Sequence, residues 1–408
     1  MDEKIYVVGA GIVGICCAIA LQKDGHKVVL IDKTGPAAGA SFGNAGAVVN
    51  GSCVPTATPG IVSSALRMLK PGGPLSISPT HLGKLLPWLI RFTLQSSENN
   101  YQRNARHLVA LTKDATNSWQ KLLNNTASSD MFKAVGWLRL FETSQAFDAN
   151  ATSRQLMTDL GTPYQTLSFD EIYDLEPNLA RIFQRGFYQP DCHFISNPQR
   201  MLQSLTERFS ASGGEFKIAE VTDIKVKQQQ AVIETTDEII YPGKVIVTAG
   251  AWSTKLTKGL NYRAPLQAER GYHITLPVTQ AISRPIVNAE QAFVLSPMET
   301  GLRVTSQVEL AAVDAPANYA QIRSLLPKVK RMLPEAEMTE QSCWMGCRPS
   351  LPDSLPIISK SADKNIFFAF GHQHLGMTLG PRTGELIADL VAGREAENDL
   401  TPHRADRF

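Results

Sequence analysis

The hydrophobic pattern at the start of the chain predicts a compact β-α-β unit. Residues 4–8 form a short apolar run, which indicates a buried strand. Residues 14–23 continue as an apolar helix, and residues 27–31 form a second strand that ends at Asp32. Because the first apolar run leads directly into a glycine loop, we expect it to be the first strand of the fold and not a signal peptide.

Beyond this unit, strand and helix patterns follow at less regular spacing. Residues 63–194 break the alternation and indicate an inserted segment. Pro381 is expected in the first turn of the last helix, and Gly393 just beyond its end. The pattern predicts strands at residues 136–141, 244–249, 273–276, 302–305 and 366–369, and helices at residues 82–94, 106–123, 198–212, 320–333 and 381–391.

The composition is that of a globular protein and narrows the classes of partner. The 408 residues are 43% hydrophobic and 19% charged, and the formal net charge is +2. No basic run stands out, which argues against a nucleic-acid partner. Cys343 and Cys347 lie close together, but no second close pair or histidine pattern completes a zinc site. We therefore expect no metal and a cytoplasmic protein of two domains, and the sequence leaves the oligomeric state open.

The longest apolar stretch, residues 82–94, allows two interpretations. It is interrupted by charged residues and a proline, and it is too short to span a bilayer, which takes about 20 residues. The stretch packs as a helix over a neighbouring domain, or it lies on a membrane surface and holds the protein peripherally at the inner face of the membrane.

The glycine loop after the first strand has the pattern of a dinucleotide site. Gly9 permits a tight turn, Gly11 allows backbone amides to approach a pyrophosphate, and Gly14 allows the helix to pack closely on the strand. Asp32 ends the second strand, where its carboxylate can accept hydrogen bonds from ribose hydroxyls and would repel a 2′-phosphate. The strand, the glycines, the helix, the second strand and the acid occur in the expected order, which makes the motif far more specific than the glycines alone.

Three later segments favour FAD over NAD as the dinucleotide. Residues 40–46 and 247–253 combine small residues with hydroxyl or amide groups, so their backbone can wrap a bulky planar group. Residues 371–380 form a glycine-rich turn that enters the last helix, whose positive N-terminus would stabilise a reduced flavin. The residues expected to contact the cofactor are Gly9, Gly11, Ile12, Val13, Gly14, Asp32, Lys33, Ser41, Asn44, Ala45, Gly46, Gly250, Gly371, Leu375, Gly376, Met377 and Thr378.

These segments, together with residues 346–353, resemble the D-amino acid oxidase-like FAD-dependent oxidoreductases, and among them the D-amino acid dehydrogenase branch. The resemblance covers nearly the whole chain and is more specific for the fold and for FAD than for the substrate. It implies an α/β protein whose overall class is α+β. A Rossmann-type FAD-binding domain of the glutathione-reductase type would be joined to a substrate domain with a mixed sheet. The FAD-binding domain is expected at residues 1–62, 195–262 and 341–408, and the substrate-binding domain at residues 63–194 and 263–340.

The resemblance also implies an activity and a mode of flavin attachment. Hydride would pass from the Cα of a small amino acid to flavin N5, and the resulting imine would hydrolyse in water. By analogy within this family, the sequence of residues 371–384 suits a cyclic substrate such as D-proline or D-hydroxyproline. Some relatives attach the flavin through a cysteine at the position that aligns with Gly346, so we expect a non-covalent flavin here, although the neighbouring Cys347 keeps covalent attachment open.

Three residues are candidates for the chemistry at the substrate. Arg348 is expected to bind the substrate carboxylate, because a guanidinium offers a planar, bidentate match to it. Tyr272 is a second candidate for the same carboxylate, against the alternative of a half-buried strand tyrosine; its neighbour His273 points to the opposite face. His374 is placed at the flavin edge. No residue stands out as an obligatory base, and the amine can bind already neutral.

The sequence leaves three functions to be distinguished. The first is a dehydrogenase that passes electrons to a quinone or another acceptor, and the second is an oxidase that reduces O2 and releases H2O2. The third is a flavin-binding sensor without turnover, against which Arg348 and Tyr272 count because a sensor needs no carboxylate anchor. The exact substrate and its stereochemistry remain open at this stage.

Overall fold

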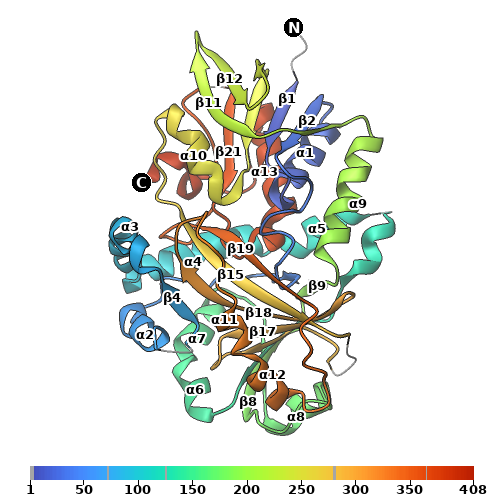
Figure 1. The fold of residues 1–408 in the computed structure, drawn as a ribbon, viewed down its shortest axis with the longest axis vertical. Helices are drawn as coiled ribbons and strands as arrows, with labels where there is room; N and C mark the ends of the chain where they lie inside the picture. The colour runs from blue at the N-terminus through green and yellow to red at the C-terminus, as the bar shows by residue number, and fades with distance from the viewer. Residues whose placement is uncertain (1–3, 71–72, 125, 279–281, 364) are drawn as a thin grey trace.

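The computed structural model describes residues 4–70, 73–124, 126–278, 282–363 and 365–408 and shows a mixed α/β protein (Figure 1). Two large sheets dominate it, one toward each end of the long axis. The predicted fold class is thereby confirmed. Within the described residues, no helix combines the length and apolar character that crossing a bilayer requires.

The first sheet contains the N-terminal β-α-β unit that the hydrophobic pattern predicts. Its order is β10 (Glu215–Ile218), β2 (Val28–Asp32), β1 (Ile5–Val8), β14 (Lys244–Val247), β21 (Ile366–Phe370) and β20 (Ile357–Lys360). The first five strands run parallel and β20 runs antiparallel to β21. Because β1, β2, β14 and β21 in the middle of the sheet are covered on both faces, they form nearly continuous apolar runs. A small sheet of β11 (Val221–Lys227), β12 (Gln230–Thr235) and β13 (Ile239–Ile240) lies beside them.

Helices α1 (Ile12–Lys23) and α13 (Gly376–Ala392) pack together beside this sheet at a very short separation (Figure 1). Glycines on α13 permit it. A Cβ on Gly380 would lie 2.7 Å from Ile12 Cγ1, and a Cβ on Gly384 would lie 2.6 Å from the Cys16 carbonyl oxygen. The close packing brings the N-terminal ends of both helices to the same place.

The start of α13 differs from the prediction. The helix begins at Gly376, so Pro381 lies in its interior and not in its first turn. A proline there leaves the carbonyl four residues earlier without its helical donor. That carbonyl belongs to Met377, and it accepts a hydrogen bond of 2.8 Å from the Trp119 indole on α5 (Ala115–Leu123). A distant side chain thus replaces the missing backbone donor and lets the helix continue through the proline.

The second sheet has nine strands and is mostly antiparallel. Its order is β19 (Ser342–Ser350), β15 (Gln267–Leu276), β18 (Gly301–Leu310), β17 (Phe293–Met298), β16 (Ile286–Asn288), β6 (Trp137–Phe141), β8 (Arg185–Gln189) and β7 (Gln165–Leu167), with β4 (Leu75–Ile77) paired to β18. One face packs on helices α11 (Ala320–Arg323) and α12 (Leu326–Met332) through a buried apolar cluster. Strands β3 (Ala47–Val48), β9 (His193–Ile195) and β5 (Phe132–Lys133) form a third small sheet.

The remaining helices follow the predicted positions in part. The helix expected at residues 106–123 is two helices, α4 (Glu98–Thr112) and α5, and the helix expected at residues 320–333 is α11 and α12. The others are α2 (Ile61–Met68), α3 (Leu82–Gln95), α6 (Ser144–Ala149), α7 (Ala151–Asp159), α8 (Phe169–Leu175), α9 (Pro198–Ala211) and α10 (Ser253–Thr257). Helix α9 begins with Pro198 in its first turn, and the Asn197 side chain caps it by accepting from the Arg200 amide.

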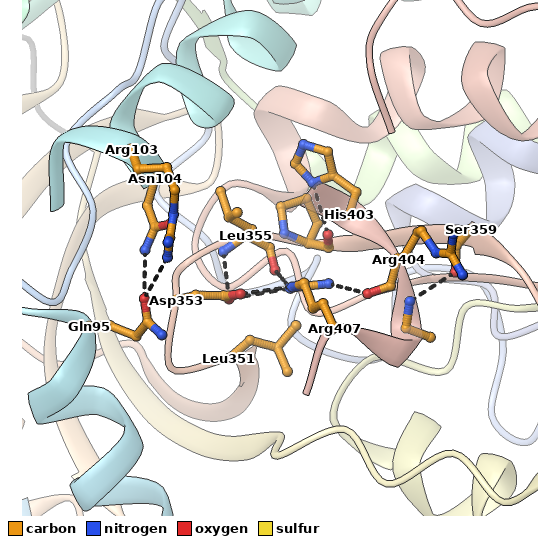
Figure 2. A network of polar contacts seen from close by, with 12 residues as sticks. Gln95, Arg103, Asn104, Leu351, Asp353, Leu355, Ser359, His403, Arg404 and Arg407 are labelled. Atoms are coloured by element: carbon orange, nitrogen blue, oxygen red, sulfur yellow. Dashed lines mark hydrogen bonds and ion pairs between the residues drawn. The ribbon is translucent and has the colours of Figure 1, made fainter. Parts of the chain in front are cut away.

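The C-terminal segment is held by the acid that follows β19 (Figure 2). Asp353 is almost completely buried and accepts from Arg407 Nε at 2.7 Å. Arg407 also donates to the Leu355 carbonyl at 2.7 Å, and the Leu355 amide donates to Asp353 at 3.1 Å. Asp353 therefore fixes the turn after β19 to the end of the chain and takes no part in the cavity described next.

Candidate active site

A cavity of about 1050 Å³ lies between the two large sheets. Its walls include the ends of β1 and β2, the starts of α1 and α13, and side chains of β15, β18 and β19. The volume is at the upper end of the range usual for small-molecule sites. In doubly wound α/β sheets, ligands bind outside the carboxyl ends of the strands, which is where this cavity lies.

The wall formed by the first sheet is built mainly from backbone. Gly9 has a φ of 111° and turns the chain from β1 toward α1. A Cβ on Gly14 would overlap the Gly9 carbonyl, so the glycine sets how closely α1 lies on the turn. Gly11 is the N-cap residue of α1 and supplies no capping side chain, while the Ile12 amide donates to Ser41 Oγ at 3.0 Å. The helix N-terminus therefore faces the cavity with amides able to bind an anion.

Asp32 is fixed at the edge of this wall. Its carboxylate accepts from the Ala10 amide at 2.8 Å, from the Thr34 amide at 2.9 Å and from the Gly35 amide at 3.1 Å. Next to it, the Lys33 ammonium lies over the Trp252 ring, 4.9 Å from the centroid. Both Asp32 and Lys33 line the cavity.

The loop of residues 41–46 is clamped by side chains of the nine-stranded sheet. Arg303 donates to the carbonyls of Phe42 and Asn44, at 3.0 and 2.8 Å. His273 Nδ1 lies 3.1 Å from the Gly43 carbonyl; burial, reinforced by the positive charge of Arg303, lowers the pKa of this histidine to about 3. A neutral ring with a proton on Nδ1 donates to that carbonyl. The second sheet thus shapes a loop that belongs to the first wall.

The turn before α13 forms a third part of the wall. The Gln373 amide donates to the Pro349 carbonyl at 3.1 Å and its side chain donates to the Leu351 carbonyl at 3.1 Å, which ties this turn to the end of β19. His374 projects into the cavity. Desolvation, together with the positive charges of Arg348 and Arg139, lowers the pKa of His374 to about 4. His374 is therefore neutral at neutral pH.

Arg348 lies in the cavity wall opposite the glycine loop. Its Nη1 donates to the Gln307 carbonyl at 3.0 Å. Gln307 has a φ of 77°, and the register of β15 and β18 shifts at this point, as at a β-bulge. Gly271 faces the bulge, and a Cβ there would overlap the Arg348 guanidinium. The bulge and the glycine together make the space in which Arg348 lies flat against the sheet.

Tyr272 is a correction to the sequence-based prediction. It is 1% exposed and lies in the apolar cluster behind the sheet, edge to face with Tyr319, and not in the cavity. Its hydroxyl donates to Glu309 and accepts from the Asn318 amide at 3.2 Å. Along β15 the cavity-facing residues are Glu269 and Gly271, so strand alternation directs Tyr272 to the other face.

Of the other expected cofactor residues, most line the cavity and two do not. Gly14 is the third residue of α1 and faces the Gly9 turn. Gly46, with a φ of 71°, is packed against β9, where its carbonyl accepts from the Ile195 amide at 2.7 Å. Those that line the cavity are Gly9, Gly11, Ile12, Val13, Asp32, Lys33, Ser41, Asn44, Ala45, Gly250, Gly371, Leu375, Gly376, Met377 and Thr378.

Three polar or aromatic residues of the cavity were missed at the sequence level. Glu269 pairs with Arg348 across β15 and β19; burial raises the pKa of this carboxyl, and Arg348 opposes the rise. Trp344 stacks on His273 with ring centroids 5.3 Å apart. Arg139 enters from β6. The motif containing Glu269 was visible in the sequence, but Trp344 and Arg139 carried no local signal.

Known proteins resemble this chain over its whole length. The family model described as "DAO: FAD dependent oxidoreductase" matches residues 4–390. The chain is 33% identical to a D-amino-acid oxidase of Bradyrhizobium diazoefficiens, covering 100% of this chain and 99% of the relative, and 29% identical to a D-amino acid dehydrogenase of Sinorhizobium medicae, covering 99% and 100%. Its fold matches glycine oxidase from Geobacillus kaustophilus, with a TM-score of 0.77 and 22% identity over 100% of this chain and 99% of that one.

Proposed function

The chain belongs to the family of FAD-dependent oxidoreductases, and we propose that it oxidises the Cα–N bond of a D-amino acid. The observation that carries the proposal is the position of Arg348, whose guanidinium lies in the same cavity as the glycine loop and the N-termini of α1 and α13. The curated relatives are named as D-amino acid oxidases and dehydrogenases, which supports the amino acid as substrate.

The residues of the first wall fit FAD. The N-terminus of α1 and the glycine edge at Gly11 suit a pyrophosphate, and the fixed carboxylate of Asp32 suits ribose hydroxyls. The N-terminus of α13, with Gly376 at its first turn, suits the electron-rich edge of a flavin ring. FAD, when bound, supplies a two-electron acceptor for the hydride that leaves the substrate Cα.

The geometry also supports a non-covalent flavin. A Cβ at position 346 would overlap the indole ring of Trp344. The same ring is packed closely over Gly43, where a Cβ would overlap it as well. A cysteine at position 346 therefore requires Trp344 to move. Burial raises the pKa of the neighbouring Cys347 thiol, which disfavours the thiolate needed for attachment.

Side chains of the protein have separate roles in binding the substrate, setting its protonation state and excluding water. Arg348 binds the α-carboxylate in bidentate fashion and so fixes the direction of the Cα–H bond. Desolvation in the cavity lowers the pKa of the bound amine, so the amine releases its proton to solvent and needs no dedicated base. His374, neutral at neutral pH, leaves this effect to desolvation. The hydrophobic residues of the cavity limit water around the reacting carbon.

Anaerobic bleaching of the purified flavoprotein tests this proposal. The yellow protein is mixed without oxygen with a panel of D- and L-amino acids, including D-proline and D-hydroxyproline as cyclic substrates, and the visible absorption is followed. We expect D-amino acids to bleach the flavin and their L-enantiomers to leave it oxidised. Bleaching by no amino acid would leave a flavin-binding sensor as the better interpretation.

For the electron acceptor, we propose a quinone or another carrier, with oxygen as the alternative. Rapid mixing of the reduced protein with air separates them: slow reoxidation with fast turnover on a quinone supports a dehydrogenase, and fast reoxidation with release of H2O2 supports an oxidase. Both names occur among the relatives, so the comparison favours neither.

If the acceptor is a membrane quinone, the protein has to contact a membrane, and helix α3 offers a surface for that contact. Helix α3 buries Leu85 and Trp88 against the end of β18, while its outer side exposes four apolar residues in successive turns. These are Leu82, Leu86, Ile90 and Leu94, each about half exposed or more. Residues 33–97 contain no acidic residue, and Lys84 and Arg91 are exposed on α3. We propose that this face lies on an anionic bilayer.

Sedimentation with vesicles tests the membrane contact apart from catalysis. The protein is expected to pellet with phosphatidylglycerol vesicles, less so at high salt, and Ile90→Glu is expected to weaken binding about tenfold or more. Ile239→Glu is the matched control, because both isoleucines are 54% exposed and Ile239 lies in the small sheet of β11, β12 and β13 beside the first sheet. If the unaltered protein does not pellet with vesicles, or if both variants lose vesicle binding equally, this face does not bind a membrane.

A further inference from the structure

Arg139 is a cavity residue without a clear role in the chemistry described above. It lies on β6, far along the nine-stranded sheet from Arg348 on β19. Its guanidinium is partly covered by the Phe187 ring, 5.8 Å from the centroid. Burial lowers the pKa of Arg139. A cation in this position costs free energy unless something compensates it.

Arg303, Arg270 and Arg348 of this sheet have such partners. Among the described residues, Arg139 and Arg185 of the same sheet have no hydrogen bond or ion pair, and of these two only Arg139 lines a cavity. Arg303 donates to two carbonyls of the 41–46 loop, and Arg270 donates to two carbonyls near residue 315 and lies 3.4 Å from Glu309. Arg348 has a carbonyl partner and Glu269 on the neighbouring strand. Within the described part of the chain, Arg139 has no hydrogen bond and no ion pair, so its charge is available to a ligand.

A smaller pocket adjoins the main cavity at Arg139. It measures about 280 Å³ and shares Arg139, His374, Ser52 and Thr56 with the main cavity. The polar side chains in the rest of its wall include Thr58, Asn150, Ser153 and Gln189. Apart from Arg139, no charged side chain among the described residues lines this pocket, so nothing there neutralises the guanidinium.

We propose that Arg139 forms a subsite for an anionic group on the substrate, so that the enzyme prefers a D-amino acid with an acidic side chain. The inference rests on the proposed function, because it assigns the α-carboxylate to Arg348. A substrate that binds both arginines of this cavity needs a second carboxylate, which D-aspartate and D-glutamate carry. A guanidinium suits a carboxylate in both charge and geometry. The polar side chains of the pocket wall can hydrogen-bond to the second oxygen of that carboxylate or to a water bound to it.

The pair D-glutamate and D-glutamine tests the subsite, because the two differ in charge and hardly in size. We expect the unaltered protein to have a kcat/KM at least tenfold higher for D-glutamate. Arg139→Met should lower kcat/KM for D-glutamate by about 10- to 100-fold and change that for D-glutamine by less than about threefold, since a hydrogen bond to a charged group accounts for such a factor. Arg139→Lys should restore part of the preference.

A matched control lies on the neighbouring strand. Arg185 is a partly buried arginine of β8 that lines neither cavity, and its guanidinium lies over Phe147, 5.0 Å from the centroid. Arg185→Met should leave the ratio of D-glutamate to D-glutamine unchanged. Equal losses for both substrates in Arg139→Met would overturn the proposal, because they would place the α-carboxylate or the fold at Arg139. A preference of the unaltered protein for D-glutamine would overturn it as well.

Calorimetric titration keeps this test separate from the proposed activity. Glutarate and butyrate are matched dicarboxylate and monocarboxylate probes that cannot be oxidised at a Cα–N bond. Glutarate should bind the FAD-loaded protein at least tenfold more tightly than butyrate, and Arg139→Met should abolish the difference. If no amino acid bleaches the flavin but this difference is present, the proposed function fails and the anion subsite stands. If glutarate and butyrate bind equally, the subsite fails whatever the substrate is.

Discussion

The two walls of the cavity are built in different ways. The wall from the first sheet presents backbone amides at helix N-termini, and its key residues are glycines that let the chain turn or pack closely. The wall from the nine-stranded sheet presents side chains, among them Arg348, whose guanidinium donates to the Gln307 carbonyl of β18. A backbone site tolerates almost no added atom, whereas a side-chain site tolerates change in proportion to the contact that is lost.

The largest effect is expected from Gly14→Ala. The new Cβ would overlap the Gly9 carbonyl, so α1 has to move away from the turn, and overpacking against backbone costs about 3 kcal/mol or more. We expect loss of bound FAD, seen in the visible spectrum, and a large fall in the melting temperature. Gly83→Ala on α3 is the control, because a Cβ there meets nothing within 4 Å. Normal FAD content in Gly14→Ala would show that the backbone wall is more tolerant than we infer.

Arg348→Ala changes the other wall and should separate catalysis from cofactor binding. Loss of a charged, bidentate hydrogen bond to the substrate is expected to lower kcat/KM by about 100-fold or more. FAD content and the visible spectrum should stay close to those of the unaltered protein, because Arg348 lies on the opposite wall from the glycine loop. Unchanged steady-state kinetics would remove Arg348 from the substrate site.

Gly271→Ala should give a smaller effect by displacing the same guanidinium. The added methyl group would overlap Arg348 in its present position, and the flexible side chain can shift to relieve the overlap. We expect kcat/KM to fall about tenfold with FAD binding unchanged. The double variant Gly271→Ala/Arg348→Ala should be no worse than Arg348→Ala, because both act through one side chain. Additive losses would show that Gly271 acts independently of Arg348.

The smallest effect is expected from a change of pH, which should lower the folding stability through one buried histidine on each wall by a similar amount. Burial lowers the pKa of His273 on one wall and of His372 on the other, each to about 3. Both histidines bind fewer protons folded than unfolded, so their stabilisation is complete above about pH 6.5 and is lost as pH falls toward 3. Each should cost on the order of 1 kcal/mol between pH 6.5 and 5.5, measured by denaturant unfolding.

Single replacements check the origin of this pH dependence. In His273→Gln and in His372→Gln, the slope of unfolding free energy against pH should become shallower by a similar amount, whatever the change in absolute stability. An unchanged slope in either variant would mean that the histidine is already protonated, or accessible to protons, in the folded protein.

The sequence by itself determined the features that depend on neighbours along the chain. The glycine loop, α1 and Asp32 lie within 32 residues, and the geometry of a strand, a tight turn and a helix follows from local residue types. The family and its cofactor follow from this unit and a few other short segments. The end of α13 at Gly393, which has a φ of 70°, is equally local, because few residues other than glycine adopt that conformation readily.

Only the tertiary structure decided which side chains meet in the cavity. Strand alternation places Tyr272 and His273 on opposite faces, but the sheet's packing against α11 and α12 determines which face is core. Trp119 lets α13 begin before Pro381, and a bulge in β18 gives Arg348 its position. Arg139 lies more than 200 residues before Arg348 and shares a cavity with it. Contacts of this kind depend on how sheets and helices pack, and a local pattern carries no information about them.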